Sequence, residues 1–125
     1  MDFGKIISSD TSEMTVRHPK TGAETDTVLT IYGPDTRKYR RAQRDFIVAQ
    51  MAVKDDGDDK EIEDAFNVFM AKLIAKWENV AIDDEQLECN YENAMKVIEI
   101  APYVARQIDQ HTSNLGNYYT EQPKS

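Results

Sequence analysis

The residues best suited to covalent chemistry are the single cysteine, Cys89, and the two histidines, His18 and His111. A cysteine paired with a histidine can act as a nucleophile, because the histidine helps to form the reactive thiolate. Glu88 and other nearby acids disfavour that thiolate, since they raise the pKa of the thiol. We therefore interpret Cys89 as a small residue, buried or half-buried beside a helix start, and we predict no catalytic residue and no enzymatic activity.

Metal and phosphate sites need ligand spacings that this chain does not offer. Zinc requires several cysteine and histidine ligands, whereas the two histidines lie near opposite ends of the chain. In the acidic stretch KDDGDDKEIE, a calcium loop centred on Gly57 would place Ala52 and Lys54 where oxygen ligands belong. The scattered glycines form no phosphate-binding loop. We therefore predict neither a metal nor a cofactor.

The one unusual cluster of charge is basic. Five cations fall within eight residues, namely Arg37, Lys38, Arg40, Arg41 and Arg44. They occupy the first turns of a predicted helix, where the helix dipole makes positive charge unfavourable. We take these five as the candidate partner-binding residues.

An acidic block follows on the next predicted helix. Between Asp55 and Asp64 the chain has seven acids and one lysine. If the two helices are antiparallel neighbours, the basic and acidic blocks lie at opposite ends, roughly 25 to 30 Å apart, with Lys72 and Lys76 at the positive end. The domain would then be an electric dipole whose poles dock a partner or meet head to tail in an oligomer. The alternative is a solvated face whose arginines pair with acids such as Asp83, Asp84 and Glu85.

The elements that must position these charges begin with a β-hairpin. Residues 14–18 and 25–32 are rich in strand-forming side chains and flank a turn at residues 19–22. Asp35 is the expected start of a helix whose apolar face carries Tyr39, Ala42, Phe46, Ala49 and Val53. Gly57 is expected to end that helix, and Asp58 or Asp59 to cap the next.

The second helix has the clearest periodicity in the sequence. Its apolar residues recur at helical spacing: Ile62, Ala65, Phe66, Phe69, Met70, Leu73, Ile74 and Trp77. Residues 78–89 suggest a small hairpin around an acidic turn. Asn90 is the expected cap of a short third helix, and Pro102 opens a fourth whose inner face is Val104, Ile108, Leu115 and Tyr118.

These elements predict an α+β fold that is mostly α, with an N-terminal β-hairpin followed by about four helices and an antiparallel central helix pair. The predicted core residues are Phe46, Ile62, Phe66, Phe69, Leu73, Trp77, Ile98 and Ile108. The single domain spans residues 14–119. Residues 1–13 are expected as a flexible end or weak edge element, and residues 120–125 as a polar tail.

The composition indicates a small, soluble, intracellular protein. Its 125 residues suit one domain, and its net charge of −8 opposes binding to nucleic acid or anionic membranes. No apolar run is long enough to span a membrane, and the first residues show no signal-peptide pattern. One cysteine fits a reducing compartment. We therefore expect protein partners, with a homo-oligomer left open.

A series of short motifs runs through residues 30–119. The longest are RKYRRAQRDF, AKWENVAID and CNYENAMKVIEIAPYVARQIDQHTSN, and the most specific parts are WENV at 77–80 and YENA at 91–94, with Pro102 after a short helix. Together they resemble the tail assembly chaperones of long-tailed bacteriophages. The turn at residues 83–86 departs from that family because it lacks a glycine.

The resemblance implies a helper protein made in the cytoplasm of the infected bacterium and absent from the mature virion. Such chaperones bind the long, aggregation-prone tape measure protein, keep it soluble and assist assembly of the tail tube around it. Some also occur in a longer, frameshifted form. The family has no active site. Two alternatives stay open: a structural tail or connector subunit of the particle, and an acidic inhibitor of a host protein.

Overall fold

The computed structural model describes residues 2–53 and 59–121. Its fold is α+β with more residues in helices than in strands, as predicted. The elements in chain order are the short 3-10 helix η1 (Phe3–Lys5), β1 (Ile6–Ser8), β2 (Thr11–Arg17), β3 (Glu24–Tyr32), α1 (Arg37–Ala52), α2 (Asp59–Lys72), β4 (Ile74–Glu78), β5 (Ala81–Ile82), β6 (Glu85–Gln86), α3 (Tyr91–Ile100), α4 (Pro102–Ser113), the 3-10 helix η2 (Leu115–Tyr118) and β7 (Tyr119–Glu121).

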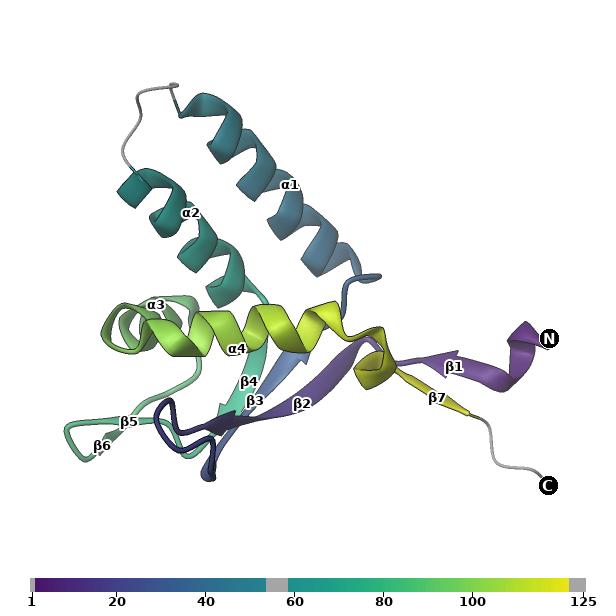
Figure 1. Ribbon diagram of the computed structural model, residues 1–125, viewed down its shortest axis with the longest axis horizontal. Coiled ribbons are helices and arrows are strands. Elements are labelled where there is room, and N and C mark those ends of the chain that lie inside the picture. The colour runs from purple at the N-terminus through teal and green to yellow at the C-terminus, as the bar shows by residue number, and fades with distance from the viewer. Residues whose placement is uncertain (1, 54–58, 122–125) are drawn as a thin grey trace.

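A three-stranded antiparallel sheet, ordered β2-β3-β4, forms the base of the molecule. The predicted N-terminal hairpin supplies β2 and β3, and Gly22 takes the positive φ of 74° that its turn requires. On β2 the buried residues Met14 and Val16 alternate with more exposed ones, and on β3 Leu29, Thr30 and Ile31 are all buried. Helices α2 and α4 contact the sheet and α3 packs on both of them, so one face of the sheet is covered (Figure 1).

The second helix ends earlier than its apolar periodicity predicts. It stops at Lys72, and Ile74, Lys76 and Trp77 lie in β4, which pairs with β3. The Tyr32 amide donates to the Leu73 carbonyl at 2.9 Å, so the chain joins the sheet as soon as it leaves the helix. The expected helical positions of these residues are therefore wrong: hydrogen bonds to the open edge of β3 outweigh the local helical pattern.

Helices α1 and α2 form the predicted antiparallel pair, which projects from the sheet in Figure 1. Phe46 packs against Phe66 and Phe69 at ring-centroid distances of 6.3 and 5.3 Å, and Tyr39 packs on Phe69 at 5.3 Å. Tyr39 thus joins the start of α1 to the second half of α2, and Phe46 joins the second half of α1 to the middle and second half of α2.

The cap of α1 is one residue later than predicted. The Thr36 hydroxyl, rather than Asp35, accepts from the Tyr39 amide at 3.2 Å. Asp35 instead accepts a hydrogen bond from the Tyr119 hydroxyl. The predicted stop at Gly57 and cap at Asp58 lie outside the described residues.

The last two helices begin where the sequence places them. Asn90 caps α3 by accepting from the Asn93 amide at 2.8 Å, and Pro102 occupies the first turn of α4. Before them, β5 and β6 form the small hairpin expected in this region. Leu115 and Tyr118 are the exceptions, because α4 ends at Ser113 and both residues lie in η2. Tyr118 is buried there, whereas Leu115 is exposed.

The core lies between the sheet and α2, α3 and α4. Of the predicted core residues, Phe69, Leu73, Ile98 and Ile108 are buried, and Phe46, Phe66 and Trp77 are partly buried against the same cluster. The prediction that Ile62 is a core residue is wrong, because Ile62 is 38% exposed. The start of α2 lies at the end of the helical hairpin far from α3 and α4 (Figure 1).

The two ends of the chain meet in a separate two-stranded ribbon. Strand β1 pairs antiparallel with β7, with Ile7 opposite Thr120. The sequence predicts either a flexible end or a weak edge element for residues 1–13. These residues contain the short strand β1, which is such an edge element, together with the start of β2. Of the expected polar tail at 120–125, residues 120 and 121 belong to β7 and the rest lie outside the described residues.

Candidate partner-binding surface

The solvent side of α1 gathers the basic cluster and an apolar cluster on one face. We call this the α1 outer face; its residues, all exposed, are Arg37, Arg40, Arg41, Arg44, Ile47, Val48 and Met51. At the helical angle of about 100° per residue they lie opposite Tyr39, Ala42 and Phe46, which face the protein. Figure 1 shows α1 at the margin of the molecule, with α2 on one side of it.

The α1 outer face has a basic half and an apolar half. The arginines occupy about the first two turns, and the apolar side chains occupy the turns that follow. Ile47 is 48% exposed, Val48 60% and Met51 80%. Neighbouring exposed apolar side chains on a monomer typically mark a surface that another protein covers.

The basic half has no acidic partner in the part of the chain that the structure describes. The ion pairs found there join Arg17 to Glu24 at 3.2 Å and Lys72 to Asp45 at 3.4 Å. Neither involves the four arginines of the α1 outer face or Lys38. Within residues 2–53 and 59–121, Asp83, Asp84 and Glu85 form no ion pair with these arginines. The alternative that the sequence left open is therefore not observed there.

The dipole expected from the sequence is present in part. The described acids of the block, Asp59, Glu61, Glu63 and Asp64, are exposed at the start of α2, at the opposite end of the helix pair from Arg37. The acids at 55, 56 and 58 lie outside the described residues. Lys72 does lie near the basic half, but it is paired with Asp45, and Lys76 is on β4.

A hollow of about 350 Å³ borders the basic half, between α1, the end of α2 and the start of α3. Lys38, Arg41 and Lys72 line it together with Asp45 and Tyr91. Its balance of charge is positive, and Arg41 belongs both to this hollow and to the α1 outer face. An acidic side chain bound near Arg41 would therefore lie close both to the arginines of the α1 outer face and to Lys38 and Lys72 in the hollow.

Cys89 also lines this hollow, and its environment does not favour catalysis. Burial raises the pKa of the thiol, so the physical cause is desolvation rather than the neighbouring acids invoked from the sequence. The histidines are engaged elsewhere: His18 Nδ1 accepts from the Lys20 amide at 3.1 Å, and His111 Nε2 contacts Ser12 Oγ at 3.1 Å. The structure does not bring a histidine to the thiol.

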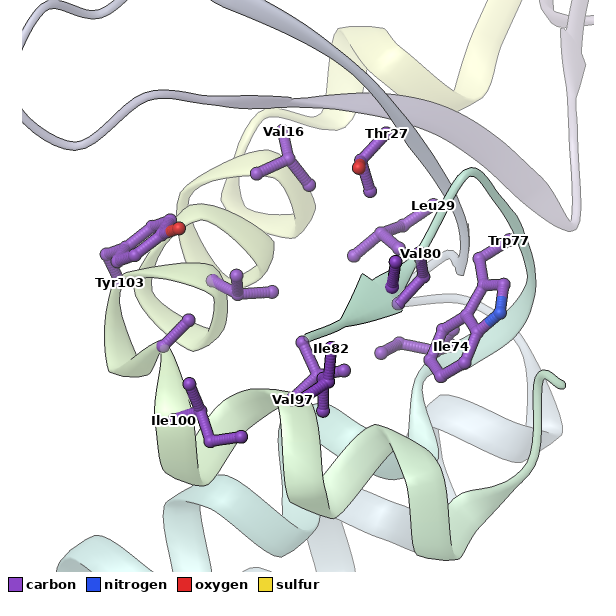
Figure 2. Close-up of a pocket in the computed structure, with 13 residues that line it drawn as sticks. Val16, Thr27, Leu29, Ile74, Trp77, Val80, Ile82, Val97, Ile100 and Tyr103 are labelled. Carbon is purple, nitrogen blue, oxygen red and sulfur yellow. The ribbon is translucent and has the colours of Figure 1, made fainter. Parts of the chain in front are cut away.

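A second, apolar pocket of about 220 Å³ lies between the sheet, β5 and the junction of α3 with α4 (Figure 2). Leu29, Trp77, Val97 and Ile100 are among the side chains that line it. Ile100 is 67% exposed at its edge. The pocket has the size and lining to take an apolar side chain, but it offers no charged group that would select one partner over another.

Two further kinds of feature are absent from residues 2–53 and 59–121. No group of three or more histidine, cysteine, aspartate or glutamate side chains is arranged to hold a metal ion there. Among the same residues, no helix has the length and apolar character needed to cross a membrane. No family model, curated protein or solved structure matches this chain.

Sequence reasoning named the basic half of the α1 outer face but missed its apolar half. Ile47, Val48 and Met51 fall outside the stripe formed by Phe46, Ala49 and Val53, which is the apolar face that the sequence predicts for this helix. The signal was nevertheless in the sequence, since Val48 and Met51 continue the spacing of the arginines. A helix needs one apolar face to pack on its own core, so a second apolar face on the same helix is available for another protein.

Proposed function

We propose that this protein is a tail assembly chaperone of a long-tailed bacteriophage, which binds the tape measure protein and keeps it soluble during assembly of the tail tube. The observation that carries the proposal is the α1 outer face, an exposed helical surface with solvated apolar side chains and arginines that have no ion-pair partner among residues 2–53 and 59–121. Such a face can hold a helical segment of another protein by apolar contact and charge complementarity. The sequence motifs supply the choice of family.

The α1 outer face suits a chaperone because it binds without forming a closed site. An aggregation-prone helical protein must be covered along its length, and the exposed Met and Val side chains can adapt to different apolar side chains in segments that share the same order of acidic and apolar residues. The chain's charge of −8 would keep the resulting complex in solution.

The direct test is co-expression with the tape measure protein encoded by the same phage, followed by pull-down and measurement of soluble tape measure protein. We expect the wild-type chain to hold the tape measure protein in solution. The triple variant Arg40→Glu, Arg41→Glu, Arg44→Glu should stay folded and lose the complex.

The matched control changes the same amount of charge elsewhere: Lys20→Glu, Lys96→Glu, Arg106→Glu, at exposed positions away from α1. This control should bind as the wild type does. If the wild-type chain fails to bind the tape measure protein and is instead recovered from purified tails, it is a structural subunit and the proposal is wrong.

A further inference from the structure

We infer that the α1 outer face takes one amphipathic helix of a different protein, acidic over about two turns and apolar over the next two. The inference rests on the proposed function, because it specifies which kind of tape measure segment would be bound. It goes beyond that function by stating the chemistry of the segment and its alignment on α1.

The spacing on α1 indicates that the occupant is itself a helix. Arg37, Arg41, Arg44, Val48 and Met51 follow one another at intervals of four, three, four and three residues. This is the spacing by which a helix meets a second helix along its length, as in a coiled coil. At a rise of 1.5 Å per residue the contact line is about 21 Å long, which corresponds to about two heptads.

Charge decides what must lie against the first half of that line. The arginines have no ion-pair partner among the described residues, and no acid occupies the first turn of α1 to offset its dipole. Glutamate or aspartate side chains from a partner would interact favourably with both the guanidinium groups and the positive helix end. Against Val48 and Met51 the partner must be apolar, since a charge there would be desolvated without a counter-ion.

A second copy of this chain does not satisfy these requirements. Two α1 helices aligned in parallel would place arginine against arginine, and aligned antiparallel they would place arginine against Val48 and Met51. The start of α2 from another copy offers Asp59, Glu61 and Asp64, but Ile62 is the only large apolar side chain exposed on the described part of α2. The occupant is therefore a different protein.

Nucleic acid fits one half of the face and not the other. Phosphates could pair with the arginines, but they would leave Ile47, Val48 and Met51 in water. The chain's overall charge of −8 opposes a polyanion as well. A helix that is acidic along part of its length and apolar along the rest covers both halves.

The test uses the full chain and synthetic helical peptides two to three heptads long. One peptide carries Glu at the contact positions of its first half and Leu at those of its second half. A second peptide has Lys in place of Glu, and a third has the first peptide's composition in a scrambled order. Binding of each labelled peptide is followed by fluorescence anisotropy, with a single-stranded oligonucleotide as a further probe.

We expect the Glu–Leu peptide to bind at least about tenfold more tightly than the Lys–Leu peptide or the scrambled one. The variant Arg37→Glu, Arg41→Glu, Arg44→Glu should reverse this preference and favour the Lys–Leu peptide. The variant Val48→Gln, Met51→Gln should weaken binding of the Glu–Leu peptide without reversing the preference. The control Lys20→Glu, Lys96→Glu, Arg106→Glu should change nothing.

The inference is overturned if the wild-type chain does not distinguish the three peptides, if it prefers the oligonucleotide, or if it self-associates through α1 so that the arginine variant turns an oligomer into a monomer. The comparison of wild-type binding to the three peptides needs no variant, so a misfolded mutant does not obstruct the test.

Failure of this inference can be separated from failure of the proposed function. A tape measure protein that stays bound when the arginines are reversed refutes the inference alone. A clear preference for the Glu–Leu peptide without any binding of the tape measure protein refutes the proposed function alone.

Discussion

The side-chain amide of Gln107 pairs with both backbone groups of Arg17, although ninety residues separate them. The Arg17 amide donates to Gln107 Oε1 at 2.9 Å, and Gln107 Nε2 donates to the Arg17 carbonyl at 2.8 Å. The two bonds reproduce what a neighbouring strand would provide, at the outer edge of β2 beside the register shift between Thr15 and Arg17. They attach α4 to that edge.

Replacing Gln107 with Ala should therefore lower the free energy of unfolding by about 1 kcal/mol, since two partly solvated hydrogen bonds are lost. Urea denaturation measures the change, and hydrogen exchange at the Arg17 amide should become faster. Gln110→Ala is the matched control, because Gln110 is exposed on the same helix. Equal effects of the two substitutions would show that the pairing contributes nothing.

Gly33 lies against the ring of Tyr118, and a side chain at this position should be costly. A Cβ added to Gly33 would lie 2.6 Å from Tyr118 Cδ1 and 3.0 Å from Cε1. We expect Gly33→Ala to destabilise the fold by about 1 to 3 kcal/mol. Gly116→Ala, whose nearest contact is a side-chain oxygen at 3.3 Å, should cost much less.

A double-mutant cycle tests the cause of that cost. In a Tyr118→Leu background the Gly33→Ala substitution should be cheaper, because the ring that it meets has been removed. Additive costs would instead mean that contact with the Tyr118 ring is not the cause.

His111 should make the protein less stable in mild acid. Burial lowers the pKa of His111 below its ordinary value of 6.5, so the folded state binds a proton less readily than the unfolded state does. The contribution of neutral His111 to the free energy of unfolding is therefore complete above pH 6.5, and it is lost as the pH falls below that value. Asn117 donates to Nδ1 at 3.2 Å, so Nε2 carries the proton and donates to Ser12 Oγ.

The measurement compares unfolding free energies at about pH 7.5 and about pH 5.5. The loss on acidification should be smaller in His111→Gln than in the wild type, whereas His18→Gln should retain the full loss. An identical loss in all three proteins would show that His111 is not its cause.

The turn between β5 and β6 should gain stability from a glycine. Asp83 and Asp84 both have positive φ, at 51° and 67°, which a two-residue hairpin turn of this type requires. Asp84→Gly should raise the free energy of unfolding by up to about 1 kcal/mol, because glycine adopts this conformation without strain. Asp64→Gly, in the exposed first turns of α2, should lower it by about the same amount. Loss of stability in Asp84→Gly would mean that the carboxylate itself stabilises the turn.

The sequence predicts the parts of this fold that local chemistry determines. The hairpin of β2 and β3, the capping residue Asn90 and the helix start at Pro102 follow from turn residues, strand-forming side chains and capping preferences within a few positions. The basic cluster at residues 37–44 is equally clear, because five cations within eight residues can be recognised without knowledge of the fold.

What the sequence misses depends on partners that are distant along the chain. Ile74 and Trp77 fit a helical pattern, and only the open edge of β3 makes them a strand. The ribbon of β1 and β7 is too short to give a periodic signal. The apolar half of the α1 outer face has a signal in the sequence, the spacing that Val48 and Met51 share with the arginines, but the exposure of these side chains is established only by the packing of Phe46 against α2.

The pairing of β1 with β7 has a consequence for how the protein is made. Strand β1 pairs with β7, a strand that is synthesised long after it, and Tyr118 reaches Gly33 at the same late stage. While the ribosome is still translating residues 118–121, the N-terminal hairpin and the α1–α2 pair can already have formed, but β1 and β7 cannot yet be paired. A nascent chain would thus expose the α1 outer face before its folding is complete, and binding to a partner could begin during translation.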